Sequence, residues 1–171
     1  MNEIYSFCSY CGNKFPKKEF PKECISCKNI TYRNPIPVAV IIVPVDSGVL
    51  LVRRGIEPGK GHLALPGGFI DYGENWREAG AREVFEELCV RIDPRKISEF
   101  KVESSTDGRL VLIFGIAEKI TMDSLGVFEV SEEALERVIQ NTPIELVFPH
   151  HTIALRDYFK KKENSDDLTS H

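Results

Sequence analysis

The chain has 171 residues, of which 42% are hydrophobic, and its formal net charge at pH 7 is -4. This length and composition can bury a sizeable core, which predicts one compact domain accompanied by a small N-terminal module. The acidic excess argues against a general nucleic-acid binder, whose surface normally carries a basic excess. No run approaches the ~18 apolar residues needed to cross a bilayer, and no signal peptide is evident. We therefore expect a cytoplasmic protein with no membrane partner.

The first expected element is a small metal module. Four of the five cysteines form two C-x2-C pairs, Cys8 with Cys11 and Cys24 with Cys27. Four thiolates at this spacing can close a tetrahedral Zn²⁺ site with no open position, which predicts a structural zinc ribbon. Two disulfides are the alternative, but disulfides are rare in a reducing cytosol. A segment of roughly thirty residues buries too little apolar surface to fold alone, so zinc would substitute for a core.

Extended chain is expected after the cysteines. Pro35 and Pro37 exclude helix and bias their neighbours toward extended backbone. Two β-branched runs, at 38–43 and 48–53, then predict neighbouring strands joined by a turn. The expected division is a zinc ribbon with its linker at residues 1–34, a main domain at 35–162 and a polar C-terminal tail at 163–171.

A strongly patterned helix is expected next. Asn75 and Glu78 have the spacing of a capping box at its N-terminus. On a helix that advances ~100° per residue, side chains three and four positions apart share one arc of the surface. The carboxylates on this arc are Glu83, Glu86 and Glu87. The apolar side chains expected on the opposite, buried face are Ala81, Val84, Phe85 and Leu88.

The acidic stripe favours a bound metal ion. Three like charges on one helix face are destabilising unless cations neutralise them. Carboxylate oxygens suit Mg²⁺ or Mn²⁺, and Mg²⁺ usually keeps several waters and takes its remaining ligands from substrate phosphates. A solvated charged face is the alternative, and for an arbitrary E-x-x-E-E cluster it would be the better interpretation. The surrounding residues reverse that preference.

Those residues follow the pattern G-x5-E-x7-R-E-V-x-E-E-x-C-V, which resembles the signature box of the Nudix hydrolases, G-x5-E-x7-R-E-U-x-E-E-x-G-U with U an aliphatic residue. Eight of the nine specified positions match: Gly68, Glu74, Arg82, Glu83, Val84, Glu86, Glu87 and Val90. The departure is Cys89, where the family has a glycine. A left-handed backbone at Cys89 would cost on the order of 1 kcal/mol, but no metal ligand is lost.

The resemblance implies an α/β fold, an α/β/α sandwich with a mixed sheet. It also implies an Mg²⁺-dependent or Mn²⁺-dependent pyrophosphohydrolase, in which water attacks a diphosphate with the assistance of the metal. Glu83, Glu86 and Glu87 would bind the metal, and the backbone carbonyl of Gly68 is a further candidate ligand.

The resemblance also assigns roles to the polar residues around the metal. Arg82 would orient the glutamates, and Glu74 would support the metal shell or act on the nucleophile. Family members differ in which carboxylate serves as general base. Glu83 is the default in this chain, and the weaker candidates outside the box are Glu103, Asp107 and Glu129.

Two arginines are candidates for binding the substrate. Arg53 and Arg54 end a predicted strand and precede the box, where a substrate could approach the metal. The planar guanidinium donates hydrogen bonds in pairs, which suits phosphate oxygens. Ordinary surface charge is the alternative for both.

A four-cysteine ribbon joined to this box resembles the zinc-ribbon subgroup of the family, which includes NADH pyrophosphatases and enzymes acting on ADP-ribose or FAD. NADH pyrophosphatases carry a stretch of the type S-Q-P-W-P-F-P-x-S after the box, whereas this chain has I-D-P-R-K-I-S-E-F at 92–100. The difference disfavours NADH. The expected nucleotide substrate is therefore a nucleoside diphosphate linked to a second moiety, and ADP-ribose, FAD or a related dinucleotide is favoured.

The chain after the box predicts further strands and two helices. The Thr106-Asp107-Gly108 turn is a strong hairpin signal, and Ser131 can cap a helix. The expected elements are strands at 97–103, 110–116 and 126–130, a helix at 131–140 and a last helix at 152–162.

Two alternatives to catalysis remain open. One is a nucleotide sensor that binds a ligand without turnover, which the complete set of box carboxylates disfavours. The other is an adaptor in which lysines of the ribbon bind protein or nucleic acid; its mark would be salt-dependent binding that is lost with the ribbon. The ribbon could equally mediate a homodimer.

Overall fold

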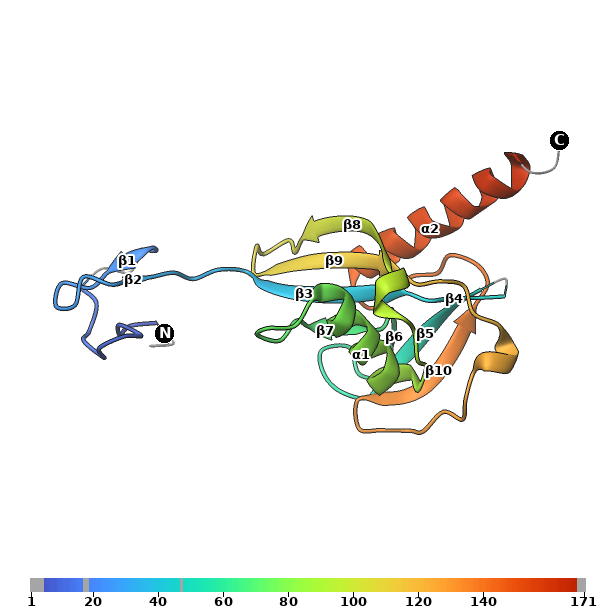
Figure 1. Ribbon diagram of the computed structural model, residues 1–171, viewed down its shortest axis with the longest axis horizontal. Helices are drawn as coiled ribbons and strands as arrows, with labels where there is room; N and C mark the ends of the chain where they lie inside the picture. Colours follow the sequence, from blue (N-terminus) through green and yellow to red (C-terminus); the bar gives the residue numbers. More distant parts are fainter. Residues whose placement is uncertain (1–4, 17–18, 47, 169–171) are drawn as a thin grey trace. The chain divides into compact units, whose positions relative to one another are not determined.

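The computed structural model describes residues 5–16, 19–46 and 48–168. The chain divides into two compact units, an N-terminal unit, Met1–Pro35, and a main unit, Ile36–His171. The N-terminal unit contains β1 (Lys22–Glu23) and β2 (Ile30–Thr31). The main unit contains, in chain order (Figure 1), β3 (Ile36–Ile42), β4 (Pro44–Val45), β5 (Gly48–Arg54), β6 (Leu63–Ala64), β7 (Gly67–Phe69), α1 (Trp76–Leu88), η1 (Pro94–Lys96), β8 (Ser98–Ser104), β9 (Leu110–Ile116), η2 (Met122–Ser124), β10 (Ala134–Gln140) and α2 (Pro149–Leu168).

The N-terminal unit has very little apolar interior. Its strands β1 and β2 pair in antiparallel fashion over two residues each, and a single bridge joins Phe7 to Lys14. The buried side chains of its hydrophobic cluster are Cys8, Phe15 and Cys24, with Cys27 packed against them. A unit of this size needs another source of stability than burial, as the sequence predicted.

The main unit contains two four-stranded sheets. One has the order β7-β3-β9-β8, in which β3 and β9 run parallel and the other neighbours are antiparallel. The other has the order β10-β5-β4, with β6 paired to β5, and all its pairs are antiparallel. The expectation of mixed sheet is confirmed.

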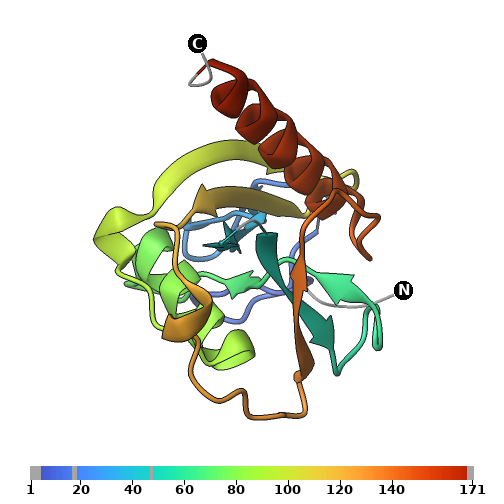
Figure 2. The ribbon, with the colours of Figure 1, turned by 90° about the vertical axis from the view of Figure 1, so that its right-hand side faces the viewer.

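Alternate residues of β3 and β5 enter two different hydrophobic clusters. Val40 and Leu51 belong to a cluster that includes Leu155 of α2. Their neighbours Ile41 and Leu50 belong to a second cluster that includes residues of α1. Because side chains alternate across a strand, the helices cover different faces of the strands, as Figure 2 shows. This arrangement is the expected α/β/α sandwich.

Local sequence and close packing both position α1. Asn75 accepts a hydrogen bond from the backbone of the first turn, and the Glu78 carboxylate accepts one from the Asn75 N–H, which is the expected capping box. A Cβ at Gly80 would lie 2.4 Å from Cδ1 of Ile41, so a larger residue there would displace the buried Ile41 side chain of β3. Phe85 is not on the buried face: it is 41% exposed, and the Arg91 guanidinium lies over its ring.

The prediction of a helix at 131–140 is wrong, because residues 134–140 form strand β10. This segment pairs with β5 from Ala134 opposite Arg54 to Gln140 opposite Val49. The Ser131 hydroxyl accepts a hydrogen bond from the Ala134 N–H, but it closes a turn into the strand rather than capping a helix. Residues 126–130, expected as a strand, lie outside every strand.

The last helix is longer than expected. It begins at Pro149, whose fixed φ suits the first turn, and continues to Leu168. Residues 163–168, expected as part of a polar tail, are therefore helical, and 169–171 lie outside the described residues. Within the described part of the chain, no helix has the length and apolar character needed to cross a membrane.

Candidate active site

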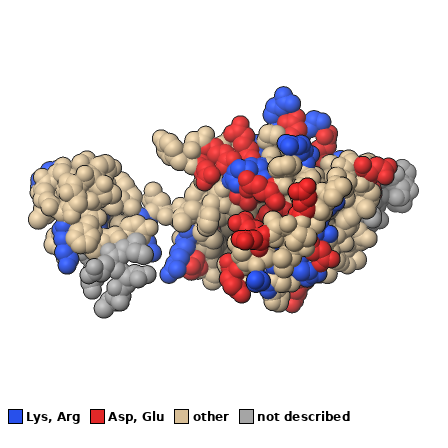
Figure 3. Space-filling model, turned by 90° about the horizontal axis from the view of Figure 1, so that it is seen from below, with Lys and Arg blue, Asp and Glu red and all other residues tan. Residues whose placement is uncertain are grey.

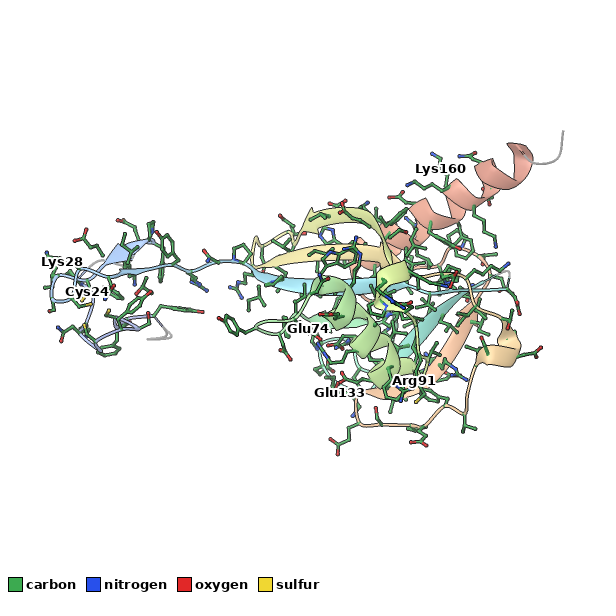
Figure 4. The ribbon with its side chains drawn as sticks, in the orientation of Figure 1. Cys24, Lys28, Glu74, Arg91, Glu133 and Lys160 are labelled. Atoms are coloured by element: carbon green, nitrogen blue, oxygen red, sulfur yellow. The ribbon has the colours of Figure 1, made fainter. Side chains whose placement is uncertain are left out.

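Arg82 on α1 gathers three carboxylates. Its Nε donates to Glu74 Oε1 at 3.0 Å and its Nη2 to Glu74 Oε2 at 3.1 Å, a paired contact. Glu74, labelled in Figure 4, belongs to the loop before the helix. Its Nη1 donates to Glu83 Oε1 at 2.7 Å and to Glu86 Oε2 at 3.0 Å. Nη2 also donates to the carbonyl of Phe69 at 3.0 Å, which connects the helix to β7. The side chain expected to orient the metal-binding glutamates is thus bonded to two of them, Glu83 and Glu86, and to Glu74.

The fourth glutamate of the site is buried. Glu87 is 6% exposed, and its carboxylate accepts a hydrogen bond from the Gly67 N–H at 3.0 Å. Burial raises the pKa of Glu87 to about 7, against the lowering effect of that N–H. Burial also raises the pKa of Glu83, although Arg82 opposes the shift. A bound cation would relieve the cost of holding these two carboxylates ionised.

The backbone of β7 approaches these carboxylates closely. A Cβ added at Gly68 would lie 2.3 Å from Glu83 Oε1, so a side chain at this position would displace the carboxylate. At Gly67 the φ angle is +156°, and a Cβ would lie 2.3 Å from the carbonyl oxygen of Ala39. The two glycines therefore let β7 lie directly against both β3 and α1.

The donor set fits a hard divalent cation. Glu83, Glu86 and Glu87 supply carboxylate oxygens from one helix, and Gly68 brings backbone next to Glu83. Arg82 occupies one oxygen of Glu83 and one of Glu86, which leaves the second oxygen of each carboxylate to bind an ion. Figure 3 shows acidic side chains gathered on the face of the main unit seen from below Figure 1, with basic side chains among them.

The two candidate substrate arginines have different surroundings. Arg53 donates from Nε to Glu136 at 2.6 Å and from Nη1 to the Gly61 carbonyl at 3.1 Å. Arg54 donates to the Pro58 carbonyl at 2.8 Å, and its guanidinium lies over the ring of Phe148. The charge of Arg54 acts to lower the pKa of Glu87, which places Arg54 near the acidic stripe. Of the two arginines, Arg54 is the better placed toward the glutamates.

The three general-base candidates outside the box lie in other surroundings. Glu103 on β8 pairs with Lys101 at 2.9 Å. Asp107 lies in the β8–β9 turn, where it accepts hydrogen bonds from Ser105 and Arg109. The backbone N–H of Glu129 donates to the Cys89 thiol at the end of α1.

One acidic residue near the site escaped the sequence analysis. The charge of Glu133 acts to raise the pKa of both Glu83 and Glu87. This residue was hidden because the segment from Ser131 was interpreted as a helix. The available signal was the β-branched pair Val138 and Ile139, which is typical of a strand.

The four N-terminal cysteines converge as a second candidate metal centre. The Sγ atoms of Cys8 and Cys27 are 3.7 Å apart, those of Cys11 and Cys24 are 3.5 Å apart, and all four lie within 4.8 Å of one another. Sulfurs bound tetrahedrally to Zn²⁺ at ~2.3 Å are roughly 3.8 Å apart, so the spacing fits zinc. Among the described residues, this is the one group of three or more such side chains gathered so closely.

Two matching turns build the cysteine cluster. Cys8 N–H donates to the Asn13 carbonyl at 2.8 Å, and Cys24 N–H donates to the Asn29 carbonyl at 2.9 Å. Hydrogen bonds from the backbone and side chain of Asn29 lower the pKa of Cys27 to about 6. A thiol that ionises easily is a better ligand, because the metal binds the thiolate.

Comparison with known proteins identifies the box. A family model described as the NUDIX domain matches residues 35–122. The chain belongs to the Nudix family. An ADP-ribose pyrophosphatase from Methanocaldococcus jannaschii is 32% identical over 158 residues, 88% of each chain. The expected enzyme class, a Nudix pyrophosphatase, is thereby confirmed.

Two further likenesses agree with this membership. A crystal structure of a Nudix hydrolase from Nitrosomonas europaea has a TM-score of 0.77 at 26% identity and covers 93% of each chain. The NAD-capped RNA hydrolase NudC of Klebsiella pneumoniae is 31% identical over 90 residues, which is 52% of this chain and 35% of that protein. The match covers 88% of the M. jannaschii ADP-ribose pyrophosphatase but only 35% of NudC.

Proposed function

We propose that this Nudix enzyme is an Mg²⁺-dependent or Mn²⁺-dependent pyrophosphohydrolase that cleaves the diphosphate of ADP-ribose or a closely related nucleoside diphosphate. The observation that carries the proposal is the acidic stripe of α1, in which Arg82 bonds Glu83 and Glu86. Glu83 is partly buried and Glu87 is buried, and burial raises the pKa of both. The extent of the match to the M. jannaschii ADP-ribose pyrophosphatase supports the choice of substrate. FAD and related dinucleotides stay in the same chemical class.

The residues divide the work by position. Glu83, Glu86 and Glu87 would hold the metal, with Gly68 contributing its carbonyl. When bound, Mg²⁺ polarises phosphoryl oxygens and lowers the pKa of the attacking water. Arg82 fixes the carboxylate side chains from within the helix, so the ligand geometry is set before substrate arrives.

Two further residues act beside the metal ligands. Glu74 is held by both branches of the Arg82 fork and keeps the guanidinium in place. Arg54 would neutralise charge on the substrate phosphates, because its guanidinium lies on the side of Glu87 and retains donors beyond its bond to Pro58.

The N-terminal unit has a different proposed role. Cys8, Cys11, Cys24 and Cys27 would bind Zn²⁺ as a closed structural site. All four ligand positions would be taken by thiolates, so the zinc would have no position for water or substrate. The unit would then stabilise its own fold and leave the chemistry to the glutamates.

Hydrolysis assays with Mg²⁺ or Mn²⁺ test the proposal. The substrates are ADP-ribose, FAD, NADH, NAD-capped RNA and nucleoside triphosphates, with AMP and phosphate measured as products. Glu86→Gln should reduce turnover of ADP-ribose by at least ~10²-fold without unfolding the protein, because it removes a ligand charge from an exposed position.

The matched control is Glu99→Gln on β8, which neutralises an exposed carboxylate outside the box and should keep wild-type turnover. A Glu86→Gln variant that turns over ADP-ribose at the wild-type rate under saturating Mg²⁺ would contradict the proposal. Binding of ADP-ribose without any hydrolysis would favour the nucleotide sensor instead.

A further inference from the structure

Arg54 leaves β5 on the face that is turned toward α1. Because side chains alternate along a strand, Arg54 lies on the same face as Val52, two residues before it. Val52 belongs to the hydrophobic cluster that contains Val84 and Leu88 of α1. The charge of Arg54 also acts on Glu87 of the same helix. Arg54 thus ends β5 beside the acidic stripe.

The backbone around Arg54 is held at three points. The Arg54 N–H donates to the His62 carbonyl at 2.9 Å, and the Gly61 N–H donates to the Arg54 carbonyl at 2.8 Å. The next residue, Gly55, donates its N–H to the carbonyl of Glu133, in the turn before β10, at 2.7 Å. A Cβ at Gly55 would lie 1.9 Å from another carbonyl oxygen of the same turn. With the strand end fixed in this way, the direction of the guanidinium depends on the contacts of the side chain.

Two contacts hold the Arg54 side chain. Its Nε donates to the Pro58 carbonyl at 2.8 Å, and its Cζ lies 5.2 Å from the centroid of the Phe148 ring. Within the described part of the chain, neither Nη group of Arg54 donates a hydrogen bond. Arg53, in contrast, donates from both Nε and Nη1. Arg54 is therefore directed by one hydrogen bond and one ring, and both of its Nη groups stay available for a phosphate.

Phe148 is itself held by the start of α2. Its ring meets the His151 ring at 5.0 Å, and the His151 ring meets that of Phe114 at 5.8 Å, both edge-on. His151 is buried, and Phe114 on β9 has no exposed surface. The Phe148 carbonyl accepts a hydrogen bond from the Thr152 N–H at 3.1 Å. A row of three rings thus connects the core of the main unit to the Arg54 guanidinium.

An aromatic ring offers a guanidinium more than an aliphatic side chain of similar size. The face of the ring carries negative charge density, so it attracts the cation that lies over it. A free arginine side chain samples many rotamers, and a substrate that binds it must offset the entropy lost when the side chain becomes ordered. A ring that already holds the guanidinium lowers this cost.

We propose that Phe148 is a positioning residue for substrate binding, whose ring holds Arg54 in the orientation in which both Nη groups meet a phosphate of the substrate. This inference rests on the proposed function, in which Arg54 binds the diphosphate. Phe148 does not contact the reacting atoms. Its contribution is made before substrate arrives and is the same for bound substrate and transition state, so it should change KM rather than kcat.

The test is Phe148→Leu, which keeps an apolar side chain and removes the ring. With ADP-ribose and saturating Mg²⁺, KM should rise roughly 3- to 30-fold, the range to which a cation–π contact corresponds, while kcat stays within about twofold. Phe148→Tyr retains the ring and should keep the wild-type KM. Phe148→Met, whose flexible side chain fills irregular space, tests the same point if Phe148→Leu does not fold.

The matched control is Phe128→Leu. Phe128 is partly buried against the same hydrophobic cluster as Phe148, and an arginine, Arg137, lies over its ring as well. The same change of side chain is therefore made in a comparable setting, without a candidate substrate arginine. The KM of Phe128→Leu for ADP-ribose should equal that of wild type.

A double-mutant cycle separates positioning from packing. In Arg54→Gln protein the ring has no guanidinium to hold, so adding Phe148→Leu should change KM by less than about twofold. An equal rise in KM in both backgrounds overturns the assignment, because the ring would then act through packing alone. A rise of less than about threefold on Phe148→Leu in the wild-type background overturns it too.

This inference and the proposed function fail in different ways. If Arg54→Gln raises KM while Phe148→Leu does not, only the positioning role is overturned. If wild type does not hydrolyse ADP-ribose, or Glu86→Gln keeps the wild-type rate, the proposed function fails and the positioning role fails with it.

Discussion

The two units of the chain place their candidate metal ligands in opposite relation to the core. In the N-terminal unit three of the four cysteines, Cys8, Cys24 and Cys27, form the core together with Phe15. In the main unit the glutamates lie on one helix, while a two-sided core of strands and helices stands behind them. The difference teaches that a bound metal can replace hydrophobic burial as the source of stability in a small unit. In a larger unit the hydrophobic core offsets the repulsion between neighbouring glutamates, so a metal bound there is not needed for folding and can serve the reaction.

Zinc removal gives the largest expected contrast between the units. Structural zinc sites contribute about 10 to 16 kcal/mol of apparent binding free energy, so chelation or Cys24→Ser should unfold the N-terminal unit. The main unit should stay folded because its core contains no cysteine ligand. Zinc content and amide hydrogen exchange would measure the former, and fluorescence of Trp76, the lone tryptophan, the latter.

Cys89→Ser is the matched control for zinc removal, because Cys89 lies outside the cluster at the end of α1. It should leave the zinc content unchanged. The decisive sample is protein purified under reducing conditions that contains no zinc. Protected amides in its N-terminal unit would show that this unit folds without the metal, contrary to the comparison.

Acid should affect the main unit through His151. Burial lowers the pKa of His151 to about 3, and its ring packs edge-on against Phe114 and Phe148. Below pH 6.5 the unfolded chain binds a proton at this residue and the folded chain does not. The stability present above pH 6.5 is therefore lost as pH falls toward 3, by up to ~1.4 kcal/mol per pH unit.

Denaturation followed by Trp76 fluorescence at pH 7 and pH 5 measures this loss. His151→Gln should be less stable than wild type at pH 7 but should lose about 2 kcal/mol less on acidification. His150→Gln, the adjacent residue, serves as the control. An equal pH dependence in wild type and His151→Gln would mean that His151 does not remain neutral in the folded state.

The smallest expected effect concerns the departure from the family pattern. Cys89 has φ 57° and ψ 33°, a left-handed C-cap whose N–H donates to the Phe85 carbonyl. Cys89→Gly removes the strain of a side chain in this region but also loses the contact of the thiol with the Glu129 backbone. Since left-handed backbone costs about 1 kcal/mol and glycine gains entropy on unfolding, we expect a change within about 1 kcal/mol and unchanged turnover.

Thermal or chemical denaturation of the Cys89→Gly protein would measure the change. A loss of more than about 2 kcal/mol would show that the thiol contact contributes more than the strain costs. The zinc content should not change on this substitution, because Cys89 belongs to the main unit and not to the cysteine cluster.

The helix that carries the box was predictable because its signals are local. The capping pair of Asn75 and Glu78 fixes where α1 begins, and the spacing of the glutamates fixes that they share a face. The same kind of reasoning failed for residues 134–140. Ser131 resembles a helix cap when considered alone, and only the pairing with β5 makes the segment a strand.

The sequence by itself determined the two C-x2-C pairs, the box and the helix start, because each depends on residues within a few positions of one another. Only the tertiary structure decided that Arg82 joins Glu74 to Glu86, that His151 is buried and that Glu133 borders the acidic stripe. The physical reason is that these relations depend on strand register and on close approach at Gly55, Gly68 and Gly80. Such contacts join segments that the local pattern of the chain does not connect.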